Sequence, residues 1–239
     1  MNKGLMDRFI NKYNLSGKAE SVKWEIKDKK VSTRFQTDDK HALGIVILND
    51  FDAPDAELNV FNTAQLKSLL PVLADEIKIS YTEAKNKGIA AVNLSDDNTS
   101  VRFVLASPNV IPEVPTLKNK PAFEVEIPLD DKFSSTFIKA KNALPDVDTC
   151  TILSDGKDCQ VVIGYSTQNT TRVSIKSTGT INGKIAPIDF MAQYLKDILS
   201  ANKESIGTLK VSSKGLAHIS FKNDEFKTDY YLVQVQTAD

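Results

Sequence analysis

The sequence predicts an α+β protein made of two similar domains, each with antiparallel sheets and two helices. A helix-like segment that starts near Val60 and leads into three strand-like runs has a counterpart that starts near Ile188. Short runs in which apolar and polar residues alternate are numerous in both halves. Four segments instead carry apolar residues at helical spacing, two in each half.

Length and composition agree with two ordinary domains. A chain of 239 residues with 41% hydrophobic and 26% charged residues can bury two cores and is typical of a globular protein. The formal net charge of -1 gives no overall attraction to nucleic acid. A site for a polyanion would therefore require local segregation of charge.

The first half contains two expected helices. In the helix expected at residues 4–15, the apolar stripe leaves Arg8 and Lys12 on the other face. In the helix expected at residues 62–74, leucines face inward and Lys67 does not. Both helices therefore offer positive charge away from the core.

Short strands account for much of the rest of the first half. Pro71 is expected to distort the end of the second helix, because proline lacks the backbone donor. A turn signal, Asn86-Lys87-Gly88, separates two of the strand-like runs. The runs that alternate best are residues 22–26, 31–35, 77–81 and 101–105.

The second half repeats this plan. Helices are expected at residues 130–144 and 188–203, with Met191 facing inward on the second of them. Lys141 flanks the core stripe, so its side is left open. The basic residues clearly off the two stripes are Lys132, Lys139, Lys196 and Lys203. Strands are expected at residues 123–127, 173–175, 209–212 and 231–235.

Charge is modestly segregated between these parts. The expected helices are net positive, whereas the rest of the chain is net negative. Composition alone favours the ordinary interpretation, in which lysines occupy solvated helix faces. The alternative is a surface that faces a polyanion.

Residues 108–121 are expected to form an extended connector between domains at residues 1–107 and 122–239. Four prolines prevent a continuous helix and favour a stiff segment. Its apolar residues are unusual for a solvated linker, so the connector is expected to pack along the surface. These residues are Val110, Ile111, Val114 and Leu117.

The amino terminus lacks the apolar region of a signal peptide, and no apolar run is long enough to span a membrane. A cytoplasmic location is therefore expected. Cys150 and Cys159 flank a predicted hairpin turn whose register places Cys159 opposite Ile152. Two free thiols are expected, because that compartment is reducing.

The sequence offers few parts for catalysis, and no cofactor is expected. His41 and His218 are the only histidines and each is isolated, which disfavours metal clusters and histidine-based triads. Residues 179–185 have the wrong spacing for a phosphate-binding loop and are expected to form a hairpin turn. Acidic residues at 50–57 show no ordered ligand spacing, so no metal site is predicted.

Three segments resemble the two-domain DNA sliding clamps, and most closely the polymerase processivity clamp of T-even and related bacteriophages. Residues 58–70 are similar to the second helix of that family. Residues 125–144 with the hairpin at 150–165 resemble the start of its second domain, and residues 230–235 resemble its last strand. The resemblance covers essentially the whole chain, although no short fingerprint defines a clamp.

The resemblance implies a DNA-clamp fold that assembles head to tail into a homotrimeric ring, with helices lining the hole and sheets outside. Such a ring encircles duplex DNA without reading its sequence, tethers a DNA polymerase and requires a clamp loader. It performs no catalysis of its own. The DNA-facing residues implied are Arg8, Lys12, Lys67, Lys132, Lys139, Lys196 and Lys203.

The resemblance also implies two contact surfaces. Ring closure would join two edge strands through Val101, Phe103, Leu105, Arg172, Val173 and Ile175. A pocket for a partner peptide would lie beside the connector and include Val110, Ile111, Val114, Leu117, Tyr231 and Val233. Each strand could instead be internal or unpaired, and the connector could simply pack on the core. The competing function is a two-domain, β-rich viral structural or scaffold protein that does not encircle DNA.

Overall fold

The computed structural model describes residues 1–84, 88–168 and 170–235, so the turn predicted at 86–88 lies outside the described residues apart from Gly88. None of the helices in these ranges has both the length and the apolar character that crossing a membrane requires. The chain divides into two compact units. Unit 1 comprises Met1–Asp38, Gly44–Pro115 and Asp224–Thr228, and unit 2 comprises Asp39–Leu43, Thr116–Asn223 and Asp229–Asp239. The domain boundaries expected at residues 107 and 122 stay a prediction.

Unit 1 contains two antiparallel arrangements of strands. One has the order β3-β2-β1-β4 and the other the order β5-β6-β7. In the first, Trp24 lies opposite Thr33 on one side and Leu58 on the other. The strands are β1 (Val22–Lys27), β2 (Lys30–Gln36), β3 (Ala42–Leu48), β4 (Ala56–Val60), β5 (Lys78–Glu83), β6 (Ile89–Ser95) and β7 (Ser100–Val104).

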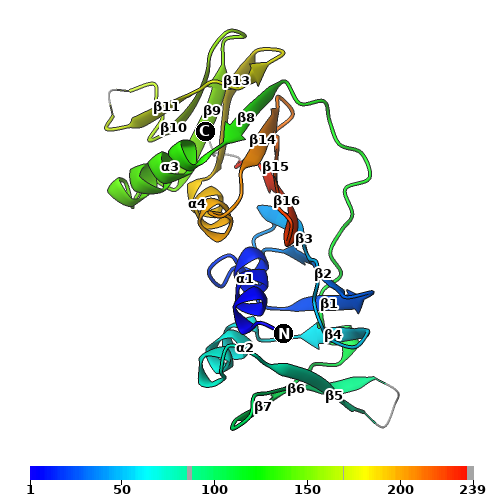
Figure 1. Ribbon diagram of the computed structural model, residues 1–239. Coiled ribbons are helices and arrows are strands. Elements are labelled where there is room, and N and C mark those ends of the chain that lie inside the picture. Colours follow the sequence, from blue (N-terminus) through cyan, green and yellow to red (C-terminus); the bar gives the residue numbers. More distant parts are fainter. Residues whose placement is uncertain (85–87, 169, 236–239) are drawn as a thin grey trace. The chain divides into compact units, whose positions relative to one another are not determined.

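Two helices lie on one side of the strands β1, β2 and β4 in unit 1 (Figure 1). Helix α1 spans Lys3–Asn14, and α2 spans Thr63–Leu69. The 3-10 turn η1 (Leu70–Val72) continues α2, which confirms the expected effect of Pro71. Phe9 and Tyr13 of α1 pack edge-on against Trp24, so one aromatic cluster joins helix and sheet.

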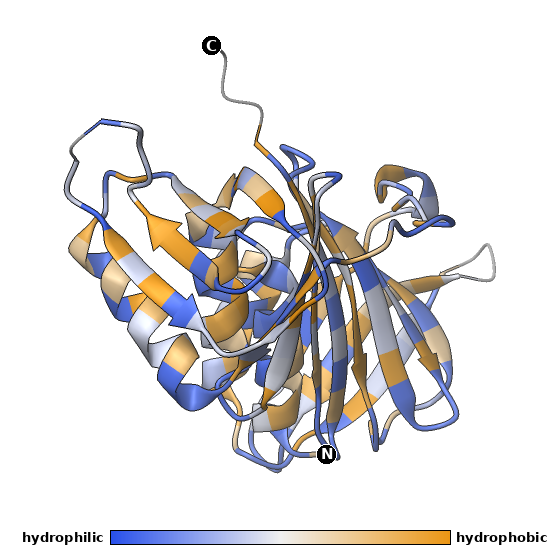
Figure 2. Cartoon of the chain, turned by 90° about the horizontal axis from the view of Figure 1, so that it is seen from above, coloured by the Kyte–Doolittle hydropathy of each residue, from blue (hydrophilic) through white to orange (hydrophobic). Residues whose placement is uncertain are grey.

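Unit 2 also has two antiparallel arrangements. Their orders are β12-β8-β14-β15-β16 and β11-β10-β9-β13. The strands are β8 (Val125–Leu129), β9 (Thr149–Ser154), β10 (Cys159–Ile163), β11 (Val173–Ser177), β12 (Thr180–Ile181), β13 (Ile185–Met191), β14 (Gly207–Ser212), β15 (Leu216–Lys222) and β16 (Phe226–Val233), of which β16 begins in unit 1. Figure 2 shows hydrophilic and hydrophobic residues alternating along several strands of the chain.

Helices α3 (Asp131–Ala143) and α4 (Ala192–Ala201) pack against each other in unit 2. The start expected for the fourth helix, residue 188, was wrong. Ile188 and Phe190 are strand residues that lie opposite Ile152 and Cys150 of β9. Their spacing of two residues buries both side chains on one face of a strand, and Met191 is the extended residue before the helix.

The described residues thus confirm the α+β class, with antiparallel sheets and two helices in each unit. Two local predictions need correction. Cys159 lies opposite Ser154, not Ile152, because the β9–β10 loop is longer than the predicted turn, although both thiols are free as expected. Residues 179–185 do not form a hairpin, since β12 pairs with β8 and β13 pairs with β9.

Candidate functional site

The basic residues of the unit 1 helices are held by acceptors in their own chain. The guanidinium of Arg8 lies 2.7 Å from the carboxylate of Glu225, and both side chains are about two-fifths exposed. Lys67 on α2 donates to the Oδ1 atom of Asn11 at 2.5 Å. Asn11 in turn donates from Nδ2 to Asp7 at 2.9 Å, which fixes the orientation of its amide.

Lys12 does not face solvent. Its side chain is fully buried, and its ammonium lies 4.6 Å from the centroid of the Phe226 ring. The prediction that Lys12 offers its charge on the outer face of the helix was therefore wrong. The sequence predicted an apolar stripe of Leu5, Phe9 and Tyr13, but the buried face of α1 is wider, since Met6 and Ile10 are buried too. The long aliphatic stem of a lysine can follow such a face into the core.

The basic residues predicted on the unit 2 helices have fewer polar partners. Lys132, Lys139 and Lys203 are exposed, and Lys196 is half-buried. Within residues 1–84, 88–168 and 170–235, none of these four ammonium groups makes a hydrogen bond or ion pair. Lys132 and Lys139 are separated by two helical turns and therefore share one face of α3.

Lys141, whose side the sequence left open, is buried and structural. Its ammonium donates to the carbonyl oxygen of Pro145 at 2.8 Å, just beyond the C-terminal end of α3. A lysine in the last turn satisfies carbonyl groups that have no partner within the helix. Lys141 is thus part of the helix end and not of an exposed basic face.

The two strands expected to close a ring are both edge strands among the described residues. β7 is the last strand of β5-β6-β7, and β11 is the first strand of β11-β10-β9-β13. Each leaves one row of backbone donors and acceptors without a strand partner there. The side chains of Val101, Phe103 and Leu105 are buried within unit 1, whereas Val104 is 68% exposed. Any pairing along β7 would therefore use its backbone and its outward side chains.

The other edge has a similar composition. Val173 and Ile175 of β11 are half-buried, while Ser174 and Lys176 point to the exposed side. Arg172 precedes the strand and is exposed. Whether these residues form an interface stays a prediction.

A hollow of about 500 Å³ in unit 1 lies between the start of the connector and the outer face of β1 and β2. Two of the residues predicted for a peptide pocket, Ile111 and Val114, line it. Val110 is 50% exposed in the short 3-10 turn η2 (Pro108–Val110). The hollow is more polar than predicted, because its floor is formed by Lys23, Glu25, Ser32, Arg34 and Ile45.

Sequence reasoning missed this floor, although a signal was present. Strand alternation assigns Lys23 and Glu25 to one face of β1, opposite the face of the buried Trp24. Register then places Arg34 directly opposite Lys23 and Ser32 opposite Glu25. That pairing could not be read from β1 alone, because it depends on the hairpin register.

The remaining predicted pocket residues belong to unit 2. Tyr231 is only 7% exposed, because the ring of His218 stacks on it at 4.6 Å and the ammonium of Lys120 lies 4.8 Å from its centroid. His218 is itself anchored to Asp229 at 2.8 Å. Val233 is 40% exposed, and Leu117 is half-buried. Tyr231 is thus covered by its own chain.

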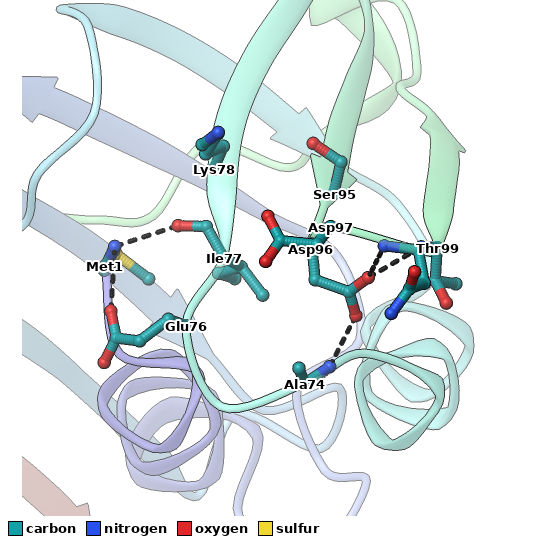
Figure 3. A pocket seen from close by; sticks show the side chains of 10 residues that line it. Met1, Ala74, Glu76, Ile77, Lys78, Ser95, Asp96, Asp97 and Thr99 are labelled. Atoms are coloured by element: carbon teal, nitrogen blue, oxygen red, sulfur yellow. Dashed lines mark hydrogen bonds and ion pairs between the residues drawn. The ribbon is translucent and has the colours of Figure 1, made fainter.

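A second hollow, of about 440 Å³, surrounds the amino terminus in unit 1 (Figure 3). The amino group of Met1 donates to the carbonyl of Ile77 at 2.8 Å and lies 3.5 Å from Glu76. Asp96 accepts backbone hydrogen bonds from Ala74, Asn98 and Thr99. These bonds, led by the one from Ala74, lower the pKa of Asp96. Its carboxylate is used to hold a loop and a hairpin turn together.

Comparison of the fold with solved structures gives matches over nearly the whole chain. One is the proliferating cellular nuclear antigen of Entamoeba histolytica, with 14% identity, a TM-score of 0.75 and coverage of 98% of this chain and 96% of that one. Another is the same antigen of A. fulgidus, bound to the C-terminal region of FEN-1, with 13% identity, a TM-score of 0.77 and coverage of 100% and 98%. No protein-family model and no curated protein matches the sequence. At this identity the likeness shows the fold, a PCNA-like clamp fold.

Proposed function

We propose that this chain is a sliding clamp that encircles duplex DNA and tethers the replicative DNA polymerase. The observation that carries the proposal is the fold likeness to two PCNA structures over 98% and 100% of the chain. A closed ring cannot leave duplex DNA sideways, so it holds a polymerase at its template without a tight DNA site. The sequence resemblance supports the T-even bacteriophage type, which would act in the cytoplasm of the host cell.

Ring closure would join three copies head to tail. Among the described residues, β7 and β11 are edge strands of two different sheets, and a heterologous contact that repeats around a ring requires two such different edges. Val104, at 68% exposure, offers an apolar side chain on β7 for such a contact. The domains at residues 1–107 and 122–239 would then alternate around the hole.

DNA contact would be weak and independent of sequence. Exposed lysines on α3 and beyond α4 can neutralise phosphates without contacting base edges. Because each such contact releases counterions, the affinity should fall as salt rises. Contacts of this kind can be exchanged between neighbouring phosphates, which permits sliding.

Partners would bind beside the connector. In the A. fulgidus structure, PCNA holds the C-terminal region of FEN-1. By analogy, the hollow lined by Ile111 and Val114 is our candidate for holding a short segment of the polymerase or of the clamp loader. The function is that of a scaffold and not of an enzyme.

The decisive experiment is DNA synthesis on a primed circular template by the cognate polymerase and clamp loader, with and without this protein. Longer products that depend on both loader and protein are expected. A linear template with free ends is the matched control, since a ring can slide off it. If product length is unchanged on the circle, the alternative of a β-rich viral structural or scaffold protein gains support. A chain that remains monomeric would point the same way.

A further inference from the structure

The two units treat the basic residues of their helices differently. Helices α1 and α2 contain four basic residues, Lys3, Arg8, Lys12 and Lys67, and each contacts a group of its own chain. Lys3, for example, donates to the carbonyl oxygen of Leu73. Of the basic residues on or just after α3 and α4, only Lys141 is engaged in this way among the described residues.

Arg8 on α1 is partly accessible but already paired. Both side chains of the pair are about two-fifths exposed, so water screens the ion pair and it contributes little in isolation. Arg8 also lies 5.3 Å from the centroid of the Phe226 ring, which limits the directions its guanidinium can take. A phosphate would have to replace the carboxylate, so the net gain from binding Arg8 is reduced.

Lys67 is restrained through two links. Asn11 accepts from its ammonium, and Asp7 accepts from the amide of Asn11. One amide group thus links the cation to the negative charge of Asp7, which opposes the attraction of Lys67 for a phosphate. Lys132 and Lys139 have no such acceptor within the described ranges, and both are exposed.

We infer that unit 2 supplies the standing phosphate contacts of the clamp, while Glu225 and the Asn11–Asp7 pair hold the Arg8 and Lys67 cations of unit 1 in reserve. This inference rests on the proposed function. A ring of alternating units would then present strong and weak contact patches in turn. DNA held by the strong patches could shift from one to the next across a weak one, which suits sliding.

The test compares matched double variants of the full chain. Lys132→Gln with Lys139→Gln removes two unit 2 charges, Arg8→Gln with Lys67→Gln removes two unit 1 charges, and Lys27→Gln with Lys30→Gln removes two exposed charges at the β1–β2 turn as a control. Affinity for a short duplex is measured by fluorescence anisotropy over a series of salt concentrations. The unit 2 pair should lower the salt slope by about 0.9 for each phosphate that is no longer neutralised, and the other two pairs should change it little. Equal effects of the unit 1 and unit 2 pairs would overturn the inference.

A second test removes the carboxylates that hold the cations of unit 1. Glu225→Gln should tighten duplex binding and steepen the salt slope by about 0.9, and Arg8→Gln in the same chain should abolish that gain. Asp7→Asn provides a second, independent release through Lys67, should Glu225→Gln lower the thermal stability. If neither Glu225→Gln nor Asp7→Asn tightens duplex binding, these carboxylates do not hold the cations back from DNA. If the unaltered chain shows no salt-dependent duplex binding at all, the inference fails, whereas the proposed function fails only if synthesis on the primed circle is unchanged.

Discussion

The ammonium group of Lys12 lies over the ring of Phe226, 4.6 Å from its centroid, and the whole side chain is buried. A cation on an aromatic face contributes about 2 kcal/mol when it is removed from water. The stem of Lys12 also packs in the core of unit 1 beside the other buried residues of α1. This lysine is therefore a stability residue, although its position in the sequence suggested a surface role.

Lys12→Ala should lower the free energy of unfolding by about 2 kcal/mol or more, because it removes the contact with Phe226 and leaves a cavity. Urea unfolding followed by the fluorescence of Trp24, the only tryptophan, measures the change. Lys18→Ala, at an exposed position after α1, is the control and should have little effect. Equal stability of the two variants would contradict the assigned role. DNA affinity per folded molecule should not change.

Val173→Asp should lower the native mass of the assembly toward that of a single chain. A charge on an edge strand that pairs with a neighbouring copy would have to be buried without a partner. Sedimentation or light scattering reads the mass directly. Ile206→Asp is a matched control, since Ile206 is 73% exposed and lies on neither edge strand. If the Val173→Asp variant keeps the native mass, β11 is not used in ring closure.

Asp96→Asn should lower the free energy of unfolding at neutral pH. It should also make that free energy fall less steeply as the solution is acidified. The pKa of Asp96 is lowered in the folded chain by backbone hydrogen bonds, first of all from Ala74. A carboxylate with a lowered folded pKa stabilises the fold above its unfolded pKa, about 3.9, and that stability is lost as pH falls through the folded pKa. Chemical unfolding at several pH values between neutrality and acid gives the comparison.

The neighbouring carboxylate provides the control for that experiment. Asp97 is exposed and lines the same hollow, yet it makes no hydrogen bond within the described residues. Asp97→Asn should therefore leave the pH dependence of the free energy of unfolding unchanged. Identical pH profiles for the two variants would mean that the bonds to Asp96 do not stabilise the fold.

Asp130→Ala should destabilise α3 by about 1 kcal/mol, the usual cost of losing an N-cap. The Oδ1 atom of Asp130 accepts from the backbone nitrogen of Phe133 at 2.7 Å. Asp131→Ala, one residue later, removes an equal charge but no capping bond and should cost a few tenths of a kcal/mol. The denaturant midpoints of the two variants, measured by far-UV circular dichroism, give the comparison. A larger effect of Asp131→Ala would contradict the capping role.

The two cysteines should resist thiol reagents in the native protein at neutral pH. Burial raises the pKa of Cys150 to about 12 and that of Cys159 to about 11. Because the thiolate is the reactive form, both thiols stay protonated and inert near pH 7. A chromogenic disulfide reagent should label neither in the native chain and both in urea. Rapid labelling of native protein would show that β9 and β10 open readily.

Local elements were predictable because their causes are local. Helix α1 was expected at 4–15 and spans Lys3–Asn14, since its apolar spacing acts within a few residues. The break after Leu69 followed from Pro71. The start of α4 was not predictable in this way, because Ile188 and Phe190 suit both periods. These residues pair with β9, which is distant in the sequence, and this pairing makes them part of a strand.

The candidate site shows the same division. The sequence correctly placed Lys132, Lys139 and Lys203 in solvent, because a helix exposes the side opposite its apolar stripe. It could not reveal that Arg8 meets Glu225, which is more than two hundred residues away in the chain. Nor could it place Lys23 and Arg34 under the connector, because the pairing of β1 with β2 sets that floor.

The sequence by itself determined the class of the protein: two similar halves, antiparallel strands, two helices in each half and a proline-rich connector. These follow from periodicity and from backbone chemistry, which act over a few residues. Only the tertiary structure decided which cations are free and which are engaged. Lys12 and Lys139 are both lysines off an expected stripe, yet Lys12 is buried against Phe226 and Lys139 is exposed. That difference depends on what a distant segment brings to each helix, and no local pattern encodes it.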